Sequence, residues 1–347
     1  MNLAFGSKSY RVCLARSEMG RYGSATTTMR CAMKNRTVAE VFAVCLWVIA
    51  LTGPVMGQTK TDGNARTAWG DPNLQGTWSY ASLTPLQRPS SLGEREYYSE
   101  EEAAERNIAV TRDVAPPPGS VGSYNALWFD RGSVSPDRRT SLITEPANGR
   151  LPVRPETTAK AEAERAYTAD HPADSWLDRS NWDRCITYHG VPPVSTGYNN
   201  TYQIFQTPDH VAILVENIHD VRIIPLDGRS QLTGDVRQWN GDSRGHWEGD
   251  TLVVETRNFS EQTQHRFPSS PGTVAVERFR RLDDNTIEHT FTIEDDSVYT
   301  QPWTGMRHMP RLPEYIIYEY ACHEGNYAMT NILSAERTGE AEASNEQ

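Results

Sequence analysis

Several polar side chains of this 347-residue sequence are of the types that carry out acid–base chemistry, and they fall in three short segments. A histidine can transfer a proton, a carboxylate can orient it, and an arginine can hold an enolate, carboxylate or phenolate. The seven candidate catalytic residues are His219, Asp220, Arg222, Asp242, Arg244, His323 and Glu324. Each lies in or beside a predicted turn at a strand end, where rigid β frameworks usually place binding groups. We therefore expect the three segments to converge at one end of the fold and to share a ligand.

Each of these candidate residues also has a purely structural interpretation. A His-Asp pair in a β-turn often caps its own backbone. Asp242 and Arg244 belong to a predicted hairpin with His246 and Glu248, and strand residues two apart share one face. That face is either a solvated hairpin surface or, if it looks into the mouth of a barrel, a polar ligand site.

The sequence gives no support to the common cofactor-dependent chemistries. It has no Walker loop, no nucleotide-binding glycine pattern after a strand, no HExxH zinc motif, and no nucleophile elbow in which GxSxG joins a strand to a helix. We therefore expect no cofactor and no bound metal, which leaves chemistry by His, Asp, Glu and Arg side chains alone.

Residues 1–57 have the pattern of a signal peptide behind an additional leader. Lys34 and Arg36 precede an apolar run over 41–51, which is too short to span a membrane and ends in small residues. A translation start at Met29 or Met33 would put this signal at the N-terminus. The sequence thus predicts a secreted or periplasmic protein, with 58–73 as a linker to the folded domain.

The charge balance argues against two classes of partner. Removing 1–57 takes away seven Lys or Arg and two Asp or Glu, which changes the formal net charge from −11 to −16. Such an acidic chain repels nucleic acid and anionic membrane surfaces. The expected partner is a small-molecule ligand or substrate.

Only two of the five cysteines, Cys185 and Cys322, lie beyond residue 57. In an exported protein, two cysteines most simply form one disulfide. The alternative is a metal site, because His189 lies four residues after Cys185 and His323 directly follows Cys322. The oxidising compartment favours the disulfide.

The rest of the sequence predicts a mainly β fold with helices confined to its first half. Ser99 and Glu102 form a capping box for a helix from about Glu100 to Ile108, and Pro155 starts another that ends near Tyr167. The runs expected to be strands are Tyr202–Thr207, Val211–Glu216, Val221–Leu226, Arg244–Trp247, Leu252–Val254, Val274–Leu282, Thr286–Ile293, Tyr299–Trp303 and Tyr315–Tyr320.

These elements predict an antiparallel β-barrel of the lipocalin-like type, or a related sandwich, spanning 74–333 as a single domain. A helical insertion occupies about 97–184, and 334–347 is expected to be a disordered tail because it is rich in Ala, Glu and Ser. His289 falls on an apolar strand face, where a core histidine with a satisfied hydrogen bond is commoner than a ligand.

Several long strings resemble a widespread family of secreted bacterial proteins without an established activity. They are LQGTWSYASLTPLQRP, YNALWFDRG, RRTSLITEP, GYNNTYQIFQTPDHVAILVENIHDVRIIPLDGR, GDSRGHWEGDTLVVET and YEYACHEGNY. The resemblance covers nearly all of the chain beyond residue 57 and implies an antiparallel β-barrel with insertions before it. His189 and His246 stand where this family would have arginine, which argues against a metal site built on either one.

Two functions remain open. One is a secreted, cofactor-independent lyase, hydratase, isomerase or hydrolase that acts on a small organic or sugar-derived molecule. The other is a carrier whose tryptophans line an apolar cavity. The candidate ligand-binding residues are Tyr198, Asn200, Trp128, Trp247 and Trp303. An enzyme should show several convergent histidines and carboxylates, whereas a carrier should show an apolar cavity with at most one ion pair.

Overall fold

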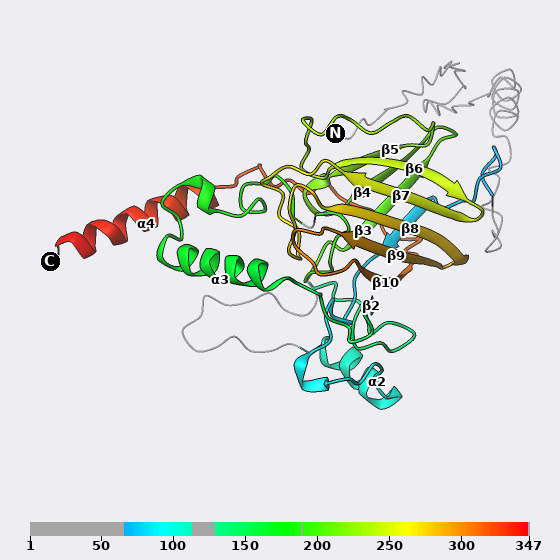
Figure 1. Ribbon diagram of the computed structural model, residues 1–347, viewed down its shortest axis with the longest axis horizontal. Coiled ribbons are helices and arrows are strands. Elements are labelled where there is room, and N and C mark those ends of the chain that lie inside the picture. Colours follow the sequence, from blue (N-terminus) through cyan, green and yellow to red (C-terminus); the bar gives the residue numbers. More distant parts are fainter. Residues whose placement is uncertain (1–65, 113–128, 189, 346–347) are drawn as a thin grey trace, which may run out of the picture. The chain divides into compact units, whose positions relative to one another are not determined.

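The computed structural model describes residues 66–112, 129–188 and 190–345, which form a mainly β protein with two antiparallel sheets (Figure 1). The four-stranded sheet has the order β1-β3-β4-β5 and the six-stranded sheet the order β2-β10-β9-β8-β7-β6. The strands of the first are β1 (Gly76–Ser79), β3 (Thr201–Gln206), β4 (His210–Val215) and β5 (Val221–Pro225). The strands of the second are β2 (Ile143–Glu145), β6 (Asp242–Glu248), β7 (Thr251–Arg257), β8 (Val274–Asp283), β9 (Thr286–Glu294) and β10 (Trp303–Pro310). The prediction of a mainly β, antiparallel fold is confirmed.

The two sheets enclose a common apolar core. Strands of both sheets alternate buried and partly buried positions, as expected when one face of a sheet is more deeply covered than the other. The largest core cluster combines Tyr202, Ile213 and Ile224 of the first sheet with Phe279 and Met309 of the second. Burial of this shared surface is the main force that holds the sheets together.

The edges of the sheets adjoin without closing a barrel among the described strands. On one side, Trp78 and Arg311 form an isolated bridge, and Leu312 N donates to Thr77 O at 2.8 Å. On the other side β5 and β6 approach closely, because a Cβ at Gly245 would lie 2.8 Å from Ile224 Cγ2. The described strands thus form two antiparallel sheets with adjoining edges, which is compatible with a sandwich, and the expected lipocalin-like barrel is not confirmed.

Helices account for the remaining regular structure. They are α2 (Glu100–Ala109), α3 (Pro155–Asp170) and α4 (Ala328–Asn345), with short 3₁₀ turns η1 (Ser90–Leu92), η3 (Trp176–Asp178) and η4 (Asn217–His219). Ser99 Oγ accepts from Glu102 N at 3.1 Å, and the Glu102 carboxylate accepts from Ser99 N at 2.8 Å. The predicted capping box of α2 is thus confirmed.

The C-terminal part of the chain differs from the sequence prediction in two ways. The expected strand Tyr315–Tyr320 is not a strand, and β10 begins at Trp303 rather than ending there. The expected disordered tail over 334–347 is helical as far as Asn345, so the prediction that helices are confined to the first half of the chain is wrong. Ala, Glu, Leu and Met are strong helix formers, so an Ala- and Glu-rich composition suits a helix as well as a disordered tail.

Cys185 and Cys322 are joined with an Sγ–Sγ distance of 2.06 Å. The pairing leaves neither sulfur free for the alternative metal site. Asn326 Nδ2 donates to Cys185 Sγ at 3.1 Å, so the bond and this contact together fix the C-terminal segment to the loop around residue 185.

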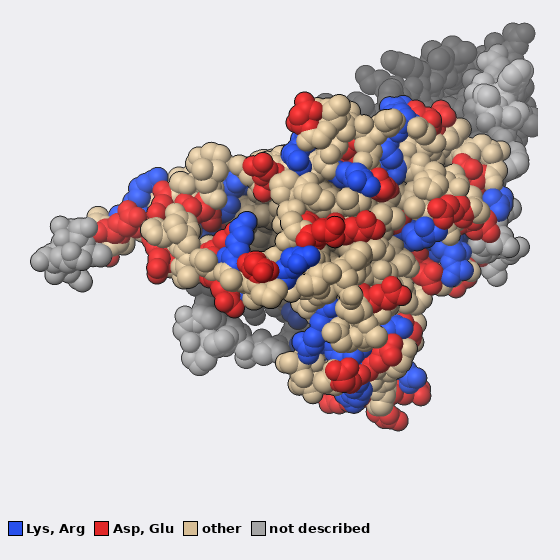
Figure 2. All heavy atoms as spheres, viewed as in Figure 1, with Lys and Arg blue, Asp and Glu red and all other residues tan. Residues whose placement is uncertain are grey.

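Acidic and basic side chains are mixed over the surface in the view of Figure 2, rather than gathered by sign. No helix of the described residues is long and apolar enough to cross a membrane.

Candidate functional site

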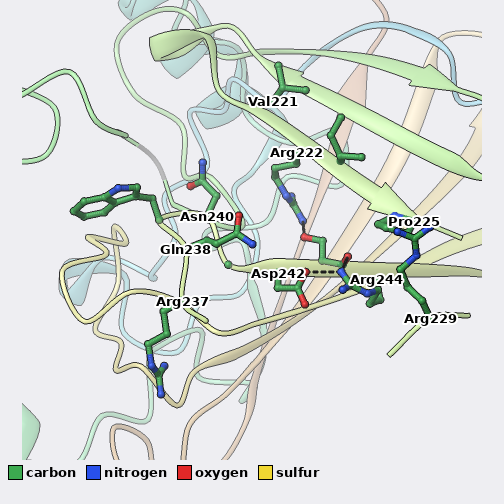
Figure 3. Close-up of a pocket in the computed structure, with 13 residues that line it drawn as sticks. Val221, Arg222, Pro225, Arg229, Arg237, Gln238, Asn240, Asp242 and Arg244 are labelled. Carbon is green, nitrogen blue, oxygen red and sulfur yellow. Dashed lines mark hydrogen bonds and ion pairs between the residues drawn. The ribbon is translucent and has the colours of Figure 1, made fainter. Parts of the chain in front are cut away.

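A cleft of about 590 Å³ opens between β5 and β6, where the two sheets adjoin (Figure 3). One wall is β5, and the other is the loop 237–241 with the first residues of β6. The lining side chains are mostly polar and comprise Val221, Arg222, Ile223, Pro225, Arg229, Arg237, Gln238, Trp239, Asn240, Asp242, Ser243 and Arg244. Its size suits a small organic molecule.

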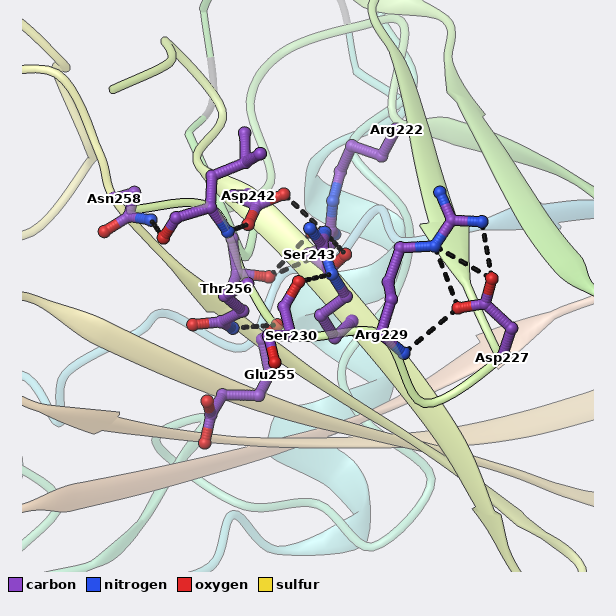
Figure 4. A network of polar contacts seen from close by, with 12 residues as sticks. Arg222, Asp227, Arg229, Ser230, Asp242, Ser243, Glu255, Thr256 and Asn258 are labelled. Atoms are coloured by element: carbon purple, nitrogen blue, oxygen red, sulfur yellow. Dashed lines mark hydrogen bonds and ion pairs between the residues drawn. The ribbon is translucent and has the colours of Figure 1, made fainter. Parts of the chain in front are cut away.

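The loop before β6 is held in place by the Asp242 carboxylate. This carboxylate is 5% exposed, accepts from Leu232 N at 2.7 Å and forms an ion pair with Arg244 (Figure 4). Arg244 in turn donates to Ser230 O at 3.1 Å and to Ser243 O at 2.7 Å. Asp242 is therefore committed to positioning the cleft wall.

Arg222 lies at the inner end of the cleft and has spare hydrogen-bonding capacity. Its side chain points inward from β5, because Arg222 and Ile224 occupy the buried positions of that strand. Nη2 donates to Glu277 Oε2 at 2.6 Å and to Thr256 Oγ1 at 3.2 Å. Nε and Nη1 are buried and find no acceptor among the described residues. The Tyr202 hydroxyl lies beside the guanidinium and interacts with it.

Behind Arg222 a row of polar side chains crosses the interior of the six-stranded sheet. Glu277 on β8, His289 on β9 and Arg307 on β10 are 0%, 0% and 2% exposed. His289 Nε2 lies 3.1 Å from Glu277 Oε1, and Arg307 Nε and Nη2 donate to His289 Nδ1 at 3.1 and 3.0 Å. Arg307 Nη1 also donates to Pro193 O at 2.7 Å. The row separates the two main apolar clusters of the core.

The environment sets the charge of each member of this row. Burial, assisted by the positive charge of Arg307, lowers the pKa of His289 to about 4. Burial alone would raise the pKa of Glu277, but Arg222 and His289 outweigh it and hold that pKa well below its usual value. At neutral pH the row therefore contains an ionised Glu277 between Arg222 and a neutral His289.

The lowered pKa of His289 predicts that the protein loses stability in mild acid. In the unfolded chain the imidazole binds a proton near pH ~6.5, whereas in the folded protein it stays neutral down to a pH of about 4. The unfolded state thus binds more protons within this window, and the stability present above it is lost as pH falls. We expect the free energy of unfolding to drop by about 2 kcal/mol between pH 7 and pH 4.5 from this group.

Urea unfolding at the two pH values measures this difference. His289→Gln should reduce the difference, whereas His171→Gln, at an exposed histidine on the far end of α3, should leave it unchanged. An equal pH dependence in wild type and His289→Gln would contradict the assignment.

A small recess adjoins the cleft on its inner side. It is lined by Gly190, Val191, Val215, Asn217, Asp220, Arg222 and Asn240. Arg222 and Asn240 line both cavities, so they form the boundary between them.

The structure brings together four of the seven predicted catalytic residues. Arg222, Asp242 and Arg244 line the cleft, and Asp220 joins Arg222 in the recess. His219 belongs to η4, but its side chain lies outside the described residues.

The remaining two, His323 and Glu324, are exposed on the turn after Cys322 and are not among the lining residues of either cavity. Two contacts join their segment to residues that are close in sequence to those of the recess. The Tyr315 hydroxyl donates to Glu216 Oε1 at 2.5 Å, next to η4, and the disulfide joins Cys322 to Cys185.

The predicted ligand-binding residues serve mainly to support the fold. Asn200 is fully buried and its amide donates to Asp130 O and Thr196 O at 2.8 and 3.0 Å. Trp303 is fully buried among Phe267, Phe291 and Tyr299.

Of the other three predicted ligand-binding residues, two are half-buried and one lies outside the described residues. Trp247 is half-buried and packs against the first core cluster. Tyr198 is half-buried in a loop, and Trp128 lies outside the described residues.

The face shared by Asp242, Arg244, His246 and Glu248 is a hairpin surface that grows more exposed along β6. His246 Nε2 lies 3.2 Å from Glu248 Oε1, and Glu248 also pairs with Arg278. The solvated interpretation therefore holds for the far half of this face, and only Asp242 and Arg244 reach the cleft.

Residues 241–245 also spell GxSxG, although the geometry is not that of a nucleophile elbow. Ser243 lies within β6 rather than on a strand-to-helix turn, is 5% exposed, and shares a hydrogen bond of 2.9 Å with Thr256 Oγ1. Its hydroxyl helps to hold Arg222, which donates to it at 3.4 Å.

Comparison with family models, with curated proteins and with solved structures finds no match for this chain. The function must therefore be argued from the site itself. Among the described residues no three or more His, Cys, Asp or Glu side chains are grouped as a metal site would require.

Proposed function

We propose that the protein binds a small polyhydroxylated carboxylate, of the kind derived from sugars, in the cleft between β5 and β6. The observation that carries this proposal is the pair of buried N–H groups of Arg222, Nε and Nη1, which have no acceptor among the described residues. A guanidinium presents its donors in a planar fork that matches a carboxylate. A ligand carboxylate would complete the hydrogen bonding of Arg222.

The other lining residues suit the hydroxylated part of such a ligand. Gln238 and Asn240 offer amide donors and acceptors, and Arg229 and Arg244 add further donors at the rim. Glu277, Asp227 and Asp242 pair with Arg222, Arg229 and Arg244, whereas Arg237 donates only to the carbonyl oxygens of Phe259 and Pro271, so its uncompensated charge can attract a ligand anion. The cleft therefore favours an acid over the corresponding neutral polyol.

The lining of this cleft does not suit an apolar ligand. An apolar cavity would need aromatic and aliphatic walls, whereas Trp78 and Trp303 belong to the core and Trp239 is the one tryptophan that lines this cleft. The polar lining thus supports the small organic or sugar-derived ligand expected of an enzyme site.

An acid–base reaction on the bound acid is a second candidate, favoured by the position of Asp220. Asp220 and Arg222 line the same recess. A carboxylate can take a proton and an adjacent guanidinium can stabilise the resulting anion, which is what a cofactor-independent lyase, hydratase, isomerase or hydrolase needs.

We also propose export to an oxidising compartment, the secreted or periplasmic location that the sequence predicts. The Cys185–Cys322 bond supports it, because disulfides persist there and are rare in the cytosol.

Calorimetric titration with gluconate, using sorbitol as the neutral match, tests the binding proposal. Arg222→Lys keeps a positive charge beside Glu277 but removes the fork, so we expect gluconate affinity to fall roughly tenfold or more. Arg280→Lys, at an exposed ion pair with Glu288 outside the cleft, is the matched control and should bind as the wild type does.

One further readout completes this experiment. Proton NMR of the same mixtures separates binding from turnover, since a carrier leaves gluconate unchanged over time. If Arg222→Lys and the wild type bind gluconate with equal affinity, Arg222 does not hold the ligand carboxylate.

A further inference from the structure

The recess behind the cleft contains an unusual concentration of unsatisfied polar groups. Asn217 is 1% exposed, and both its Nδ2 and its Oδ1 lack a hydrogen-bond partner among the described residues. Arg222, which is 5% exposed and lines the same recess, adds the unpaired Nε and Nη1. Four buried donor or acceptor atoms on two adjoining side chains are thus left without partners.

Such an arrangement requires a polar occupant. Burying a polar group without a partner forfeits the hydrogen bonds that it made to water in the unfolded chain. Native proteins therefore satisfy nearly all such groups with protein atoms, with ordered water or with a ligand. Asn217 supplies both a donor and an acceptor, which a hydroxyl group can satisfy at the same time because it too donates and accepts.

The size of the recess limits what can enter it. Its volume is about 10 Å³, which is space for roughly one water molecule or one hydroxyl oxygen and is too small for a carboxylate. Arg222 and Asn240 form the boundary with the cleft, so a group in the recess must be attached close to the group that Arg222 holds.

We propose that the recess is a subsite for the hydroxyl next to the ligand carboxylate, so that the protein selects α-hydroxy acids and Asn217 determines this specificity. The inference rests on the proposed binding of a polyhydroxylated carboxylate in the cleft. With the carboxylate on Arg222, the α-hydroxyl enters the recess, donates to Asn217 Oδ1 and accepts from Asn217 Nδ2. An acid without this hydroxyl leaves the amide unpaired or leaves a water molecule there.

The test compares gluconate with 2-deoxygluconate, which differ only in the α-hydroxyl. We expect the wild-type dissociation constant to be at least roughly tenfold higher for 2-deoxygluconate, because a site built to bond a hydroxyl discriminates against a ligand that lacks it. Asn217→Leu, which is close in volume but apolar, should bind the two acids equally. Asn217→Ser, which retains a donor and an acceptor, should keep part of the preference and serves as the second variant if Asn217→Leu does not fold.

The outcomes separate this inference from the proposal on which it rests. If gluconate binds no better than sorbitol, the proposed function fails. If gluconate binds better than sorbitol but equally well as 2-deoxygluconate, or if both Asn217 variants keep the full wild-type preference, only the assignment of the recess fails.

Discussion

Replacing Glu277 with glutamine is expected to lower the free energy of unfolding by about 3 kcal/mol at pH 7. Glutamine keeps the volume of the side chain but removes the charge that balances Arg222, whose side chain is 3% exposed and pairs with Glu277 at 2.6 Å. A guanidinium left in the interior without its counter-charge retains the desolvation cost and loses most of the attraction that offsets it. Urea unfolding followed by tryptophan fluorescence measures the difference.

Strands β8 and β9 supply a matched control for this substitution. Glu288 on β9 pairs with Arg280 on β8 at 2.9 Å, but that pair lies at the surface, with side-chain exposures of 26% and 51%. Glu288→Gln should therefore change stability by less than about 1 kcal/mol, as exposed ion pairs do. If Glu277→Gln and Glu288→Gln have the same free energy of unfolding, the charge of Glu277 does not stabilise the buried Arg222.

Removing the disulfide is expected to have the second large effect. The bond between Cys185 and Cys322 closes a loop of 137 residues, which corresponds to about 5 kcal/mol on the chain-entropy model, while measured losses usually fall between about 2 and 5 kcal/mol. The Cys185→Ser, Cys322→Ser double variant should lose stability within that range. The loss arises mainly because the unfolded chain gains conformational freedom.

Reduced wild-type protein is the control for the double variant. Both lack the bond, so their unfolding free energies should agree, and both should lie below that of the oxidised protein. An oxidised wild type no more stable than the double variant would mean that the bond does not constrain the unfolded chain.

Much of the β framework could be predicted from the sequence because alternation of apolar and polar residues is a local signal. In β9 the positions Ile287, His289, Phe291 and Ile293 alternate with polar residues, and all four are buried as predicted. Local patterning does not say which strands become neighbours, however. The choice between a barrel and two adjoining sheets depends on how the β5 and β6 edges meet, where Gly245 permits close approach.

The C-terminal errors have a related cause. Residues 315–320 have the composition of a strand, but strand propensity produces a strand only where a partner edge is available. In the structure Tyr315 instead donates to Glu216 and Tyr320 accepts from Trp182 Nε1 at 3.2 Å. These contacts join segments far apart in sequence, which composition cannot reveal.

For the site, the sequence indicated the charged residues at strand ends and missed both the charged residues within strands and the asparagines. Arg222, Asp242 and Arg244 were predicted because they stand at strand ends. Glu277 and Arg307 were missed although both occupy inward positions of their strands, where a charged residue in the alternation is itself a signal. Asn217 and Asn240 carry no such signal, since an asparagine in a turn usually serves the backbone.

The central claim is that Arg222 receives the carboxylate of a ligand in the cleft, and titration of the wild-type protein with gluconate and with sorbitol tests it most directly. The two molecules have the same carbon chain and differ only where the carboxylate replaces a hydroxymethyl group. The account predicts saturable one-site binding of gluconate, at least roughly tenfold tighter than that of sorbitol, because a charge-assisted hydrogen bond to a guanidinium exceeds a neutral one. Equal affinity for the two, or no binding of either, would contradict it.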